Sequence, residues 1–183
     1  MARDQLLWIS ITATAVLGLL LLLGQSSSDE DVEALFSTAD DPDPLAFECL
    51  DHSGLARHDH VALKIFIDGE PETVPGLIGI NSGVCNSEGE NMHAVHTHGD
   101  EGTLHIELNE AGDVPLGVFF DIWGVHFDET GIFDHRVNDT HEMRMHVIAS
   151  GGVASEENRV TSFDEYLLQN GETIEIHDPA IGL

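Results

Sequence analysis

Apolar and polar residues alternate on both sides of a short glycine-bounded segment at residues 99–102. This Gly-Asp-Glu-Gly segment has the composition of a turn, and the flanking alternation has the period of two that is typical of β-strands. The pattern predicts a β-hairpin with His96 opposite His105 and His98 opposite Thr103. One face, directed toward a core, would carry Val95, Thr97, Leu104, Ile106 and Leu108. The other face would carry His96, His98, His105 and Glu107.

The apolar pattern elsewhere predicts more strands and one or two short helices. Residues 61–67 are rich in β-branched and aromatic residues and predict a strand, which Asp68-Gly69 turns into a hairpin. Residues 116–124 carry apolar side chains at helical spacing and predict a short helix that ends at Gly124. Residues 143–149 and 173–177 are the last two predicted strands, and a short helix or turn at 163–168 separates them.

Two polar stretches predict no regular structure. The first surrounds Gly54, and its histidines at 58 and 60 immediately precede the strand at 61–67 and share its parity. The second, residues 125–142, holds three histidines among acidic residues and is expected to be a solvated connection. The elements together predict a mainly β or α+β fold class: a mostly antiparallel sheet of about five to seven strands with one or two short helices, preceded by one transmembrane helix.

Residues 6–24 form an uncharged apolar run. As a helix, these residues would extend roughly 28 Å, which is close to the thickness of a bilayer core. Arg3 precedes the run and acidic residues follow it, so the positive-inside rule predicts a single-pass cell-membrane protein with a cytoplasmic N-terminus and an extracellular domain. A cleaved secretory signal is the alternative. The predicted organisation is a membrane anchor at residues 1–24, an acidic disordered tether at 25–46 and a histidine-rich globular domain at 47–183.

Acidic residues are spread along the whole predicted soluble part of the chain. Asp and Glu number 34 against six Lys and Arg, which gives a formal net charge of −28. Such a surface repels itself in dilute buffer and is screened by concentrated counterions, so it predicts a halophilic protein. The absence of a basic cluster argues against nucleic-acid binding.

Cys49 and Cys85 are the two cysteines of the chain. In an extracytoplasmic domain, two cysteines form a disulfide more often than a metal site, although one thiolate joining imidazoles at a copper site is the alternative. Asn138 begins an Asn-Asp-Thr sequon, which predicts glycosylation if the domain lies outside the cell.

The histidines on one face of the predicted hairpin are candidate metal ligands. Several imidazoles with a nearby carboxylate form the donor set that zinc or copper requires. The candidate ligands are His96, His98, His105, His58 and His60. Candidate supporting or additional ligands are His93, Asp100 and Glu107. The alternative interpretation is that these are ordinary polar residues on the wet face of a hairpin, and it gains weight if the register slips by one residue.

Short motifs follow one another in a recurring order between residues 58 and 124. They are His58–His60, Asp68–Gly69, Ile78–Ile80, His96–Thr97–His98, Gly102–Glu107 and Phe119–Gly124. This order resembles a group of small membrane-anchored or secreted histidine-rich domains of archaea and bacteria, over roughly residues 49–123 and more loosely 168–176. In that group the Ile-Gly-Ile motif is a strand, and an aspartate follows His-Thr-His, where this chain has Gly99 and then Asp100. The resemblance implies an extracytoplasmic histidine-rich domain and names no reaction.

Three functions remain open at this point. The first is a membrane-anchored extracytoplasmic domain that binds copper or zinc for capture, buffering or delivery. Its partners would be the metal ion and, through residues 6–24, the membrane. The second is a structural or adhesion module of the cell envelope that binds no metal. The third is a metal-dependent hydrolase or oxidase, in which a three-histidine site would activate water and Glu101 or Glu107 would act as the general base.

Overall fold

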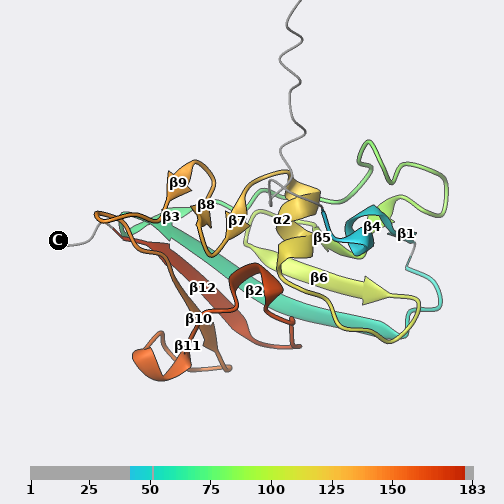
Figure 1. Cartoon of the computed structure of the whole chain (residues 1–183). Coiled ribbons are helices and arrows are strands. Elements are labelled where there is room, and N and C mark those ends of the chain that lie inside the picture. The colour runs from blue at the N-terminus through green and yellow to red at the C-terminus, as the bar shows by residue number, and fades with distance from the viewer. Residues whose placement is uncertain (1–41, 51, 180–183) are drawn as a thin grey trace, which may run out of the picture. The chain divides into compact units, whose positions relative to one another are not determined.

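A seven-stranded sheet built around one long strand dominates the computed structural model, which describes residues 42–50 and 52–179. The strand order is β11-β10-β12-β2-β6-β5, and β3 pairs with the far end of β2 (Figure 1). The strands are β2 (Arg57–Ile67), β3 (Glu70–Glu72), β5 (Val95–Thr97), β6 (Thr103–Leu108), β10 (Arg144–Ile148), β11 (Arg159–Val160) and β12 (Thr173–Asp178). Adjacent strands are antiparallel except β12 and β2, which are parallel.

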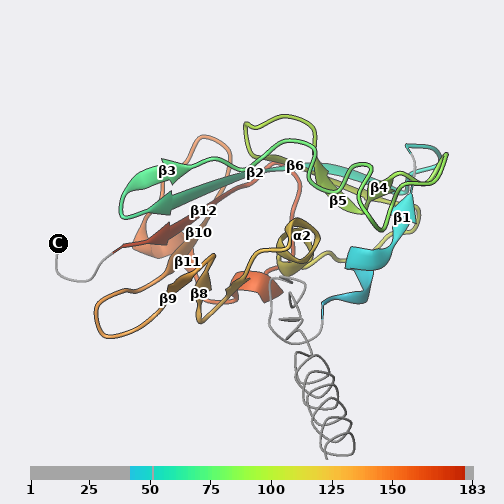
Figure 2. The same cartoon turned by 90° about the horizontal axis from the view of Figure 1, so that it is seen from above.

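Smaller elements cover and extend this sheet. One two-stranded sheet pairs β1 (Cys49–Leu50) with β4 (Met92–His93), and a three-stranded sheet contains β7 (Phe127–Asp128), β8 (Gly131–Ile132) and β9 (His135–Arg136). The helices are α2 (Gly117–Trp123) and the 3-10 helices η1 (Pro44–Phe47), η2 (Glu156–Asn158) and η3 (Phe163–Glu165). Helix α2 and the β7–β9 sheet lie on the same side of the β2–β6 part of the large sheet (Figure 2).

The core lies between this side of the sheet and α2. Side chains alternate across β2 and β6, and the buried apolar residues of each strand, Val61, Leu63 and Ile65 in β2 and Leu104, Ile106 and Leu108 in β6, share this face. Helix α2 contributes two adjacent, fully buried phenylalanines and ends at Gly124 with φ of 77°, a left-handed conformation that glycine adopts at little cost. Fully or almost fully buried residues of this core include Val61, Leu63, Ile65, Leu104, Ile106, Phe119 and Phe120.

The predicted fold class is confirmed in its main features. The described residues are mainly β with one short α-helix, and the helix and its glycine stop lie where the spacing predicts them. The predicted strands at 61–67, 143–149 and 173–177 are present, although β2 begins earlier, at Arg57, so His58 and His60 lie on the strand and not in an irregular segment before it. The Ile78–Ile80 motif, expected as a strand by resemblance, forms a turn that ends in an isolated bridge from Ile80 to Met92.

The prediction of a solvated connection at residues 125–142 is wrong. This segment forms β7, β8 and β9, and Phe127 and Ile132 face each other across the β7–β8 pair, both fully buried. The Phe127 ring stacks on that of Phe120 in α2, with 4.2 Å between the ring centroids. Two apolar residues therefore fix a segment whose overall composition is polar and acidic.

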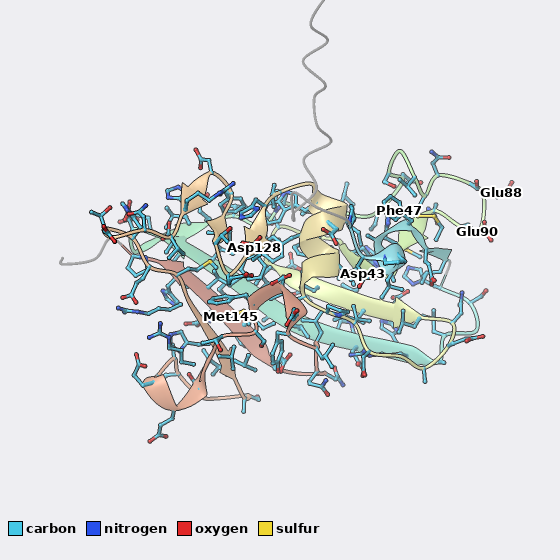
Figure 3. The ribbon with its side chains drawn as sticks, viewed as in Figure 1. Asp43, Phe47, Glu88, Glu90, Asp128 and Met145 are labelled. Carbon is cyan, nitrogen blue, oxygen red and sulfur yellow. A yellow bond between two sulfur atoms is a disulfide. The ribbon has the colours of Figure 1, made fainter. Side chains whose placement is uncertain are left out.

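The predicted membrane anchor and most of the predicted tether lie outside the described residues. Within residues 42–50 and 52–179, none of the helices has the length and apolar character needed to cross a bilayer. Acidic side chains are prominent on the surface of this part, for example Glu88 and Glu90 on the loop between β3 and β4 (Figure 3).

Candidate metal centre

The predicted hairpin forms with the predicted register. Strand β5 pairs with β6 so that His96 lies opposite His105 and Thr97 opposite Leu104, and residues 99–102 form the connecting bend. The five residues predicted to face the core are all buried. Four of them pair with one another across β5 and β6, separately from the histidine pair. Gly102, at φ of 73°, lets the bend approach β2, because a Cβ there would lie 2.3 Å from the Leu63 carbonyl oxygen.

Strand β2 extends the same face on the other side of β6. His60 lies opposite His105 and His58 lies opposite Glu107. One row across the sheet therefore contains His96, His105 and His60. The next row contains Glu107 and His58. Directly opposed residues have Cβ atoms about 4.5–5.5 Å apart, so this grid brings the imidazoles close enough to share an ion.

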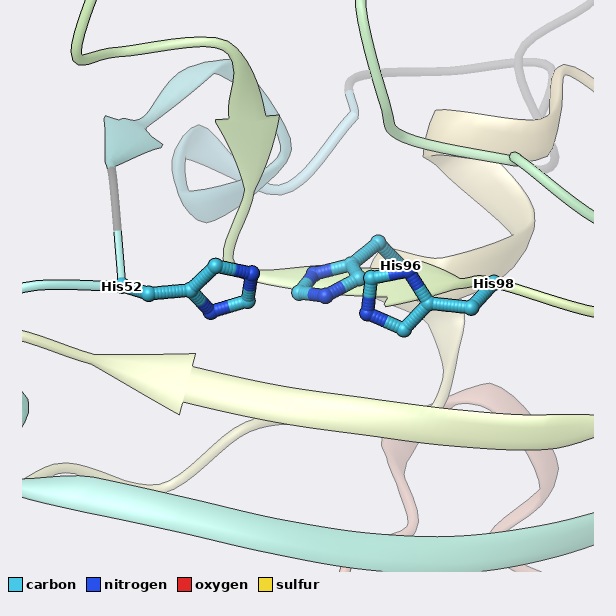
Figure 4. Close-up of side chains that lie close together, drawn as sticks. All are labelled: His52, His96 and His98. Carbon is cyan, nitrogen blue, oxygen red and sulfur yellow. The ribbon is translucent and has the colours of Figure 1, made fainter.

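His52 completes the cluster from outside the sheet. Its ring points from the segment between β1 and β2 toward the ring of His96 (Figure 4), and the centroids are 6.0 Å apart. His98, just beyond the end of β5, lies 5.0 Å from His96 and 4.5 Å from His105 between centroids. The loop position of His52 is 44 residues from His96 and follows no strand period, so sequence reasoning did not select it.

These side chains form three overlapping groups of donor atoms, which we call the outer β5 group, the outer β2 group and the central group. Within each group the donor atoms lie within 4.8 Å of one another, which is close enough to bind one metal ion. The outer β5 group is His52, His96 and His98; the outer β2 group is His58, His60 and His105; the central group is His96, His105 and Glu107.

The central group contains buried polar atoms that lack hydrogen-bond partners. Six side-chain atoms of the described residues are buried without a hydrogen-bond partner, and three of them belong to this group: His96 Nε2, His105 Nδ1 and Glu107 Oε1. His96 and Glu107 have no exposed surface, and His96 Nε2 lies 4.0 Å from Glu107 Oε1. A buried polar atom without a hydrogen bond costs about 1–3 kcal/mol. For Glu107 Oε1, the nearby His58 Nε2, at 3.3 Å, offsets part of that cost. The convergence of these atoms favours a role beyond stability, and binding of a cation would satisfy all three.

The surroundings keep the two imidazoles of the central group neutral. Burial, with a smaller contribution from the neighbouring histidines, lowers the pKa of His96 from 6.5 to about 4, against the opposing effect of a hydrogen bond to the His93 carbonyl. Burial and the nearby histidines lower the pKa of His105 to about 4 as well. Neutral imidazole is the form that binds metal.

His93 and Asp100 do not join these groups. The His93 ring donates from Nδ1 to the Ala46 carbonyl at 2.7 Å, and Ser82 Oγ lies 2.6 Å from its Nε2. Its backbone carbonyl, however, accepts a hydrogen bond from His96 Nδ1 at 3.0 Å. That bond places the lone pair of neutral His96 on Nε2, facing the central group.

Asp100 is exposed in the bend and belongs to none of the three groups that the described residues form.

The remaining predicted features lie away from this face. The disulfide is confirmed: Cys49 and Cys85 are bonded, so neither thiol is a metal ligand. Asn138 is exposed in a turn near β9, and its glycosylation stays a prediction.

Comparison of the chain with family models, with curated proteins and with solved structures finds no match in any of the three.

Gly79 positions the strand that carries His96. Its φ is 75°, and a Cβ there would lie 2.8 Å from the Val95 carbonyl oxygen and 3.1 Å from the Cβ of His96. Gly79→Ala is therefore expected to lower the free energy of unfolding by about 1–3 kcal/mol in urea denaturation. Gly83→Ala is the matched control, since its Cβ would meet nothing within 4 Å, and equal effects of the two substitutions would contradict this role of Gly79.

Proposed function

We propose that this protein is a membrane-anchored extracytoplasmic domain that binds copper or zinc on the histidine face of its sheet, in capture, buffering or delivery of the ion. The observation that carries the proposal is the convergence of His96 Nε2, His105 Nδ1 and Glu107 Oε1, all buried and without hydrogen-bond partners. An envelope module that used these residues only for structure would gain stability from pairing or replacing them.

The chemistry of the donor set supports the choice of metals. Imidazole suits zinc and copper, whereas calcium and magnesium prefer sites composed of oxygen donors. Two imidazoles and one carboxylate leave room for a further ligand, and the neighbouring imidazoles group with His96 (His52 and His98) or with His105 (His58 and His60). This surplus of imidazoles favours binding and transfer over catalysis, in which a coordination position stays open for substrate.

Charge and compartment fit the same function. A net charge of −28 raises the local concentration of cations at the surface and so favours their capture. The Cys49–Cys85 disulfide is of the kind that persists in an oxidising environment outside the cytoplasm. The apolar run at residues 6–24 would attach the domain to the membrane there.

A competition titration tests the proposal. The full chain, stripped with chelator and kept in high salt, is titrated with Zn²⁺ or Cu²⁺ against a coloured chelator of known affinity. Replacing both His96 and His105 by glutamine is expected to weaken binding at least 100-fold, because two of three central donors are lost. The control is His146→Gln, a buried histidine on the same sheet but outside the three groups, which should change affinity less than twofold.

Two results would overturn the proposal. One is the absence of stoichiometric metal on the unaltered chain, and the other is equal affinity in the unaltered chain and the double variant. Glu107→Gln, which keeps the size of the side chain, gives a second measurement if the double variant does not fold, and it is expected to weaken binding at least tenfold.

A further inference from the structure

The two outer groups have no residue in common. His52, His96 and His98 form one, and His58, His60 and His105 form the other. Each group supplies three imidazoles, so both can be filled at once. The central group takes His96 from one and His105 from the other, so an ion there competes with ions in both outer groups.

Glu107 stands between the two outer groups with one carboxylate oxygen toward each. Its Oε2 lies 2.8 Å from Nδ1 of His52, and its Oε1 lies 3.3 Å from Nε2 of His58. The side chain is fully buried and enters from β6, the strand between β5 and β2. A carboxylate in this position can bind one cation through each oxygen.

We propose that the histidine face binds two transition-metal ions side by side, one in each outer group, with Glu107 as a bridging carboxylate. The inference rests on the proposed function and extends it from one ion to two. At low metal supply a single ion occupies the central group, where the donors are most buried. At higher supply His96 and His105 separate to the two outer groups, and the negative charge of Glu107 offsets the repulsion between the two cations.

Exposure differs between the two arrangements in a way that suits transfer. His52, His58, His60 and His98 are exposed, whereas His96 and Glu107 are buried. Ions in the outer groups are therefore accessible to an acceptor from solvent, and the central ion is shielded. When two ions are bound, one can be passed to an acceptor. The other ion then moves to the central group, where it is retained.

Metal stoichiometry of the full chain tests this arrangement. Saturation with Cu²⁺ followed by gel filtration and elemental analysis is expected to give two ions per chain. His52→Ala and His60→Ala each remove a donor from one outer group and none from the central group, so each should reduce the ratio to one. The control His146→Gln should keep two.

Magnetic coupling tests the bridge separately. Two Cu²⁺ ions that share a carboxylate are expected to give a half-field electron paramagnetic resonance signal, which His52→Ala, His60→Ala and Glu107→Gln should each abolish. One ion per unaltered chain, or two ions without coupling, would overturn the two-ion arrangement and leave the proposed function standing. Absence of any bound metal would overturn both.

Discussion

Lowering the pH from 6.5 to about 4 is expected to reduce the free energy of unfolding of the metal-free chain. The loss should exceed that of the variant His96→Gln by about 3 kcal/mol. His96 titrates near 6.5 when unfolded, but burial lowers its pKa to about 4 in the folded chain. Between these values the unfolded state binds more protons, so stability falls as the pH falls. Below about 4 both states are protonated and the difference between the two chains stays constant.

The comparison with His96→Gln isolates this histidine from the many carboxylates that titrate in the same range. Urea denaturation of both chains at several pH values, with chelator present, gives the difference directly. His146→Gln serves as a control for the loss of a buried histidine side chain. Parallel stability curves for the unaltered chain and His96→Gln would show that His96 is not held neutral by burial.

Local sequence patterns were enough to predict the hairpin that carries His96 and His105. Glycines at both ends of the bend and strict alternation on either side leave one register that buries Leu104 and Ile106. The same reasoning predicts α2, because the apolar spacing and Gly124 are local signals. The disulfide was predicted because two cysteines in an extracytoplasmic domain pair with each other more often than they bind metal, and the chain contains no other cysteines.

Contacts between distant segments could not be predicted in the same way. The parallel pairing of β12 with β2 joins residues more than 100 positions apart, and no local pattern specifies it. The role of His52 depends on where the chain turns after the disulfide, which involves no strand period. The position of Glu107 between His52 and His58 depends on the pairing of β2 with β6, which places His58 opposite Glu107 and which no local pattern specifies.

Reduction of the Cys49–Cys85 disulfide is expected to lower the free energy of unfolding by about 3–4 kcal/mol and to weaken metal binding at least tenfold. The first effect follows from the 36-residue separation of the cysteines, because the bond restricts the unfolded chain. The second follows from two connections to the metal centre. Cys49 pairs with His93 in the β1–β4 ladder, and it precedes His52 by three residues.

The second connection runs through Cys85. Its backbone N–H donates to Ser82 Oγ at 2.8 Å, and Ser82 Oγ lies 2.6 Å from Nε2 of His93. The His93 carbonyl in turn accepts from Nδ1 of His96. Opening the disulfide therefore loosens both the segment that carries His52 and the carbonyl that fixes the tautomer of His96.

The double variant Cys49→Ser/Cys85→Ser, measured by competition titration and urea denaturation, should reproduce both effects, and reductant should then have no further effect on it. Combining it with His52→Ala separates the two connections. If the disulfide acts mainly by holding His52, the two changes will weaken binding less together than the sum of their separate effects. If it acts mainly through His93 and His96, the effects will add. Unchanged affinity in the reduced chain would show that the metal centre is held by the seven-stranded sheet alone.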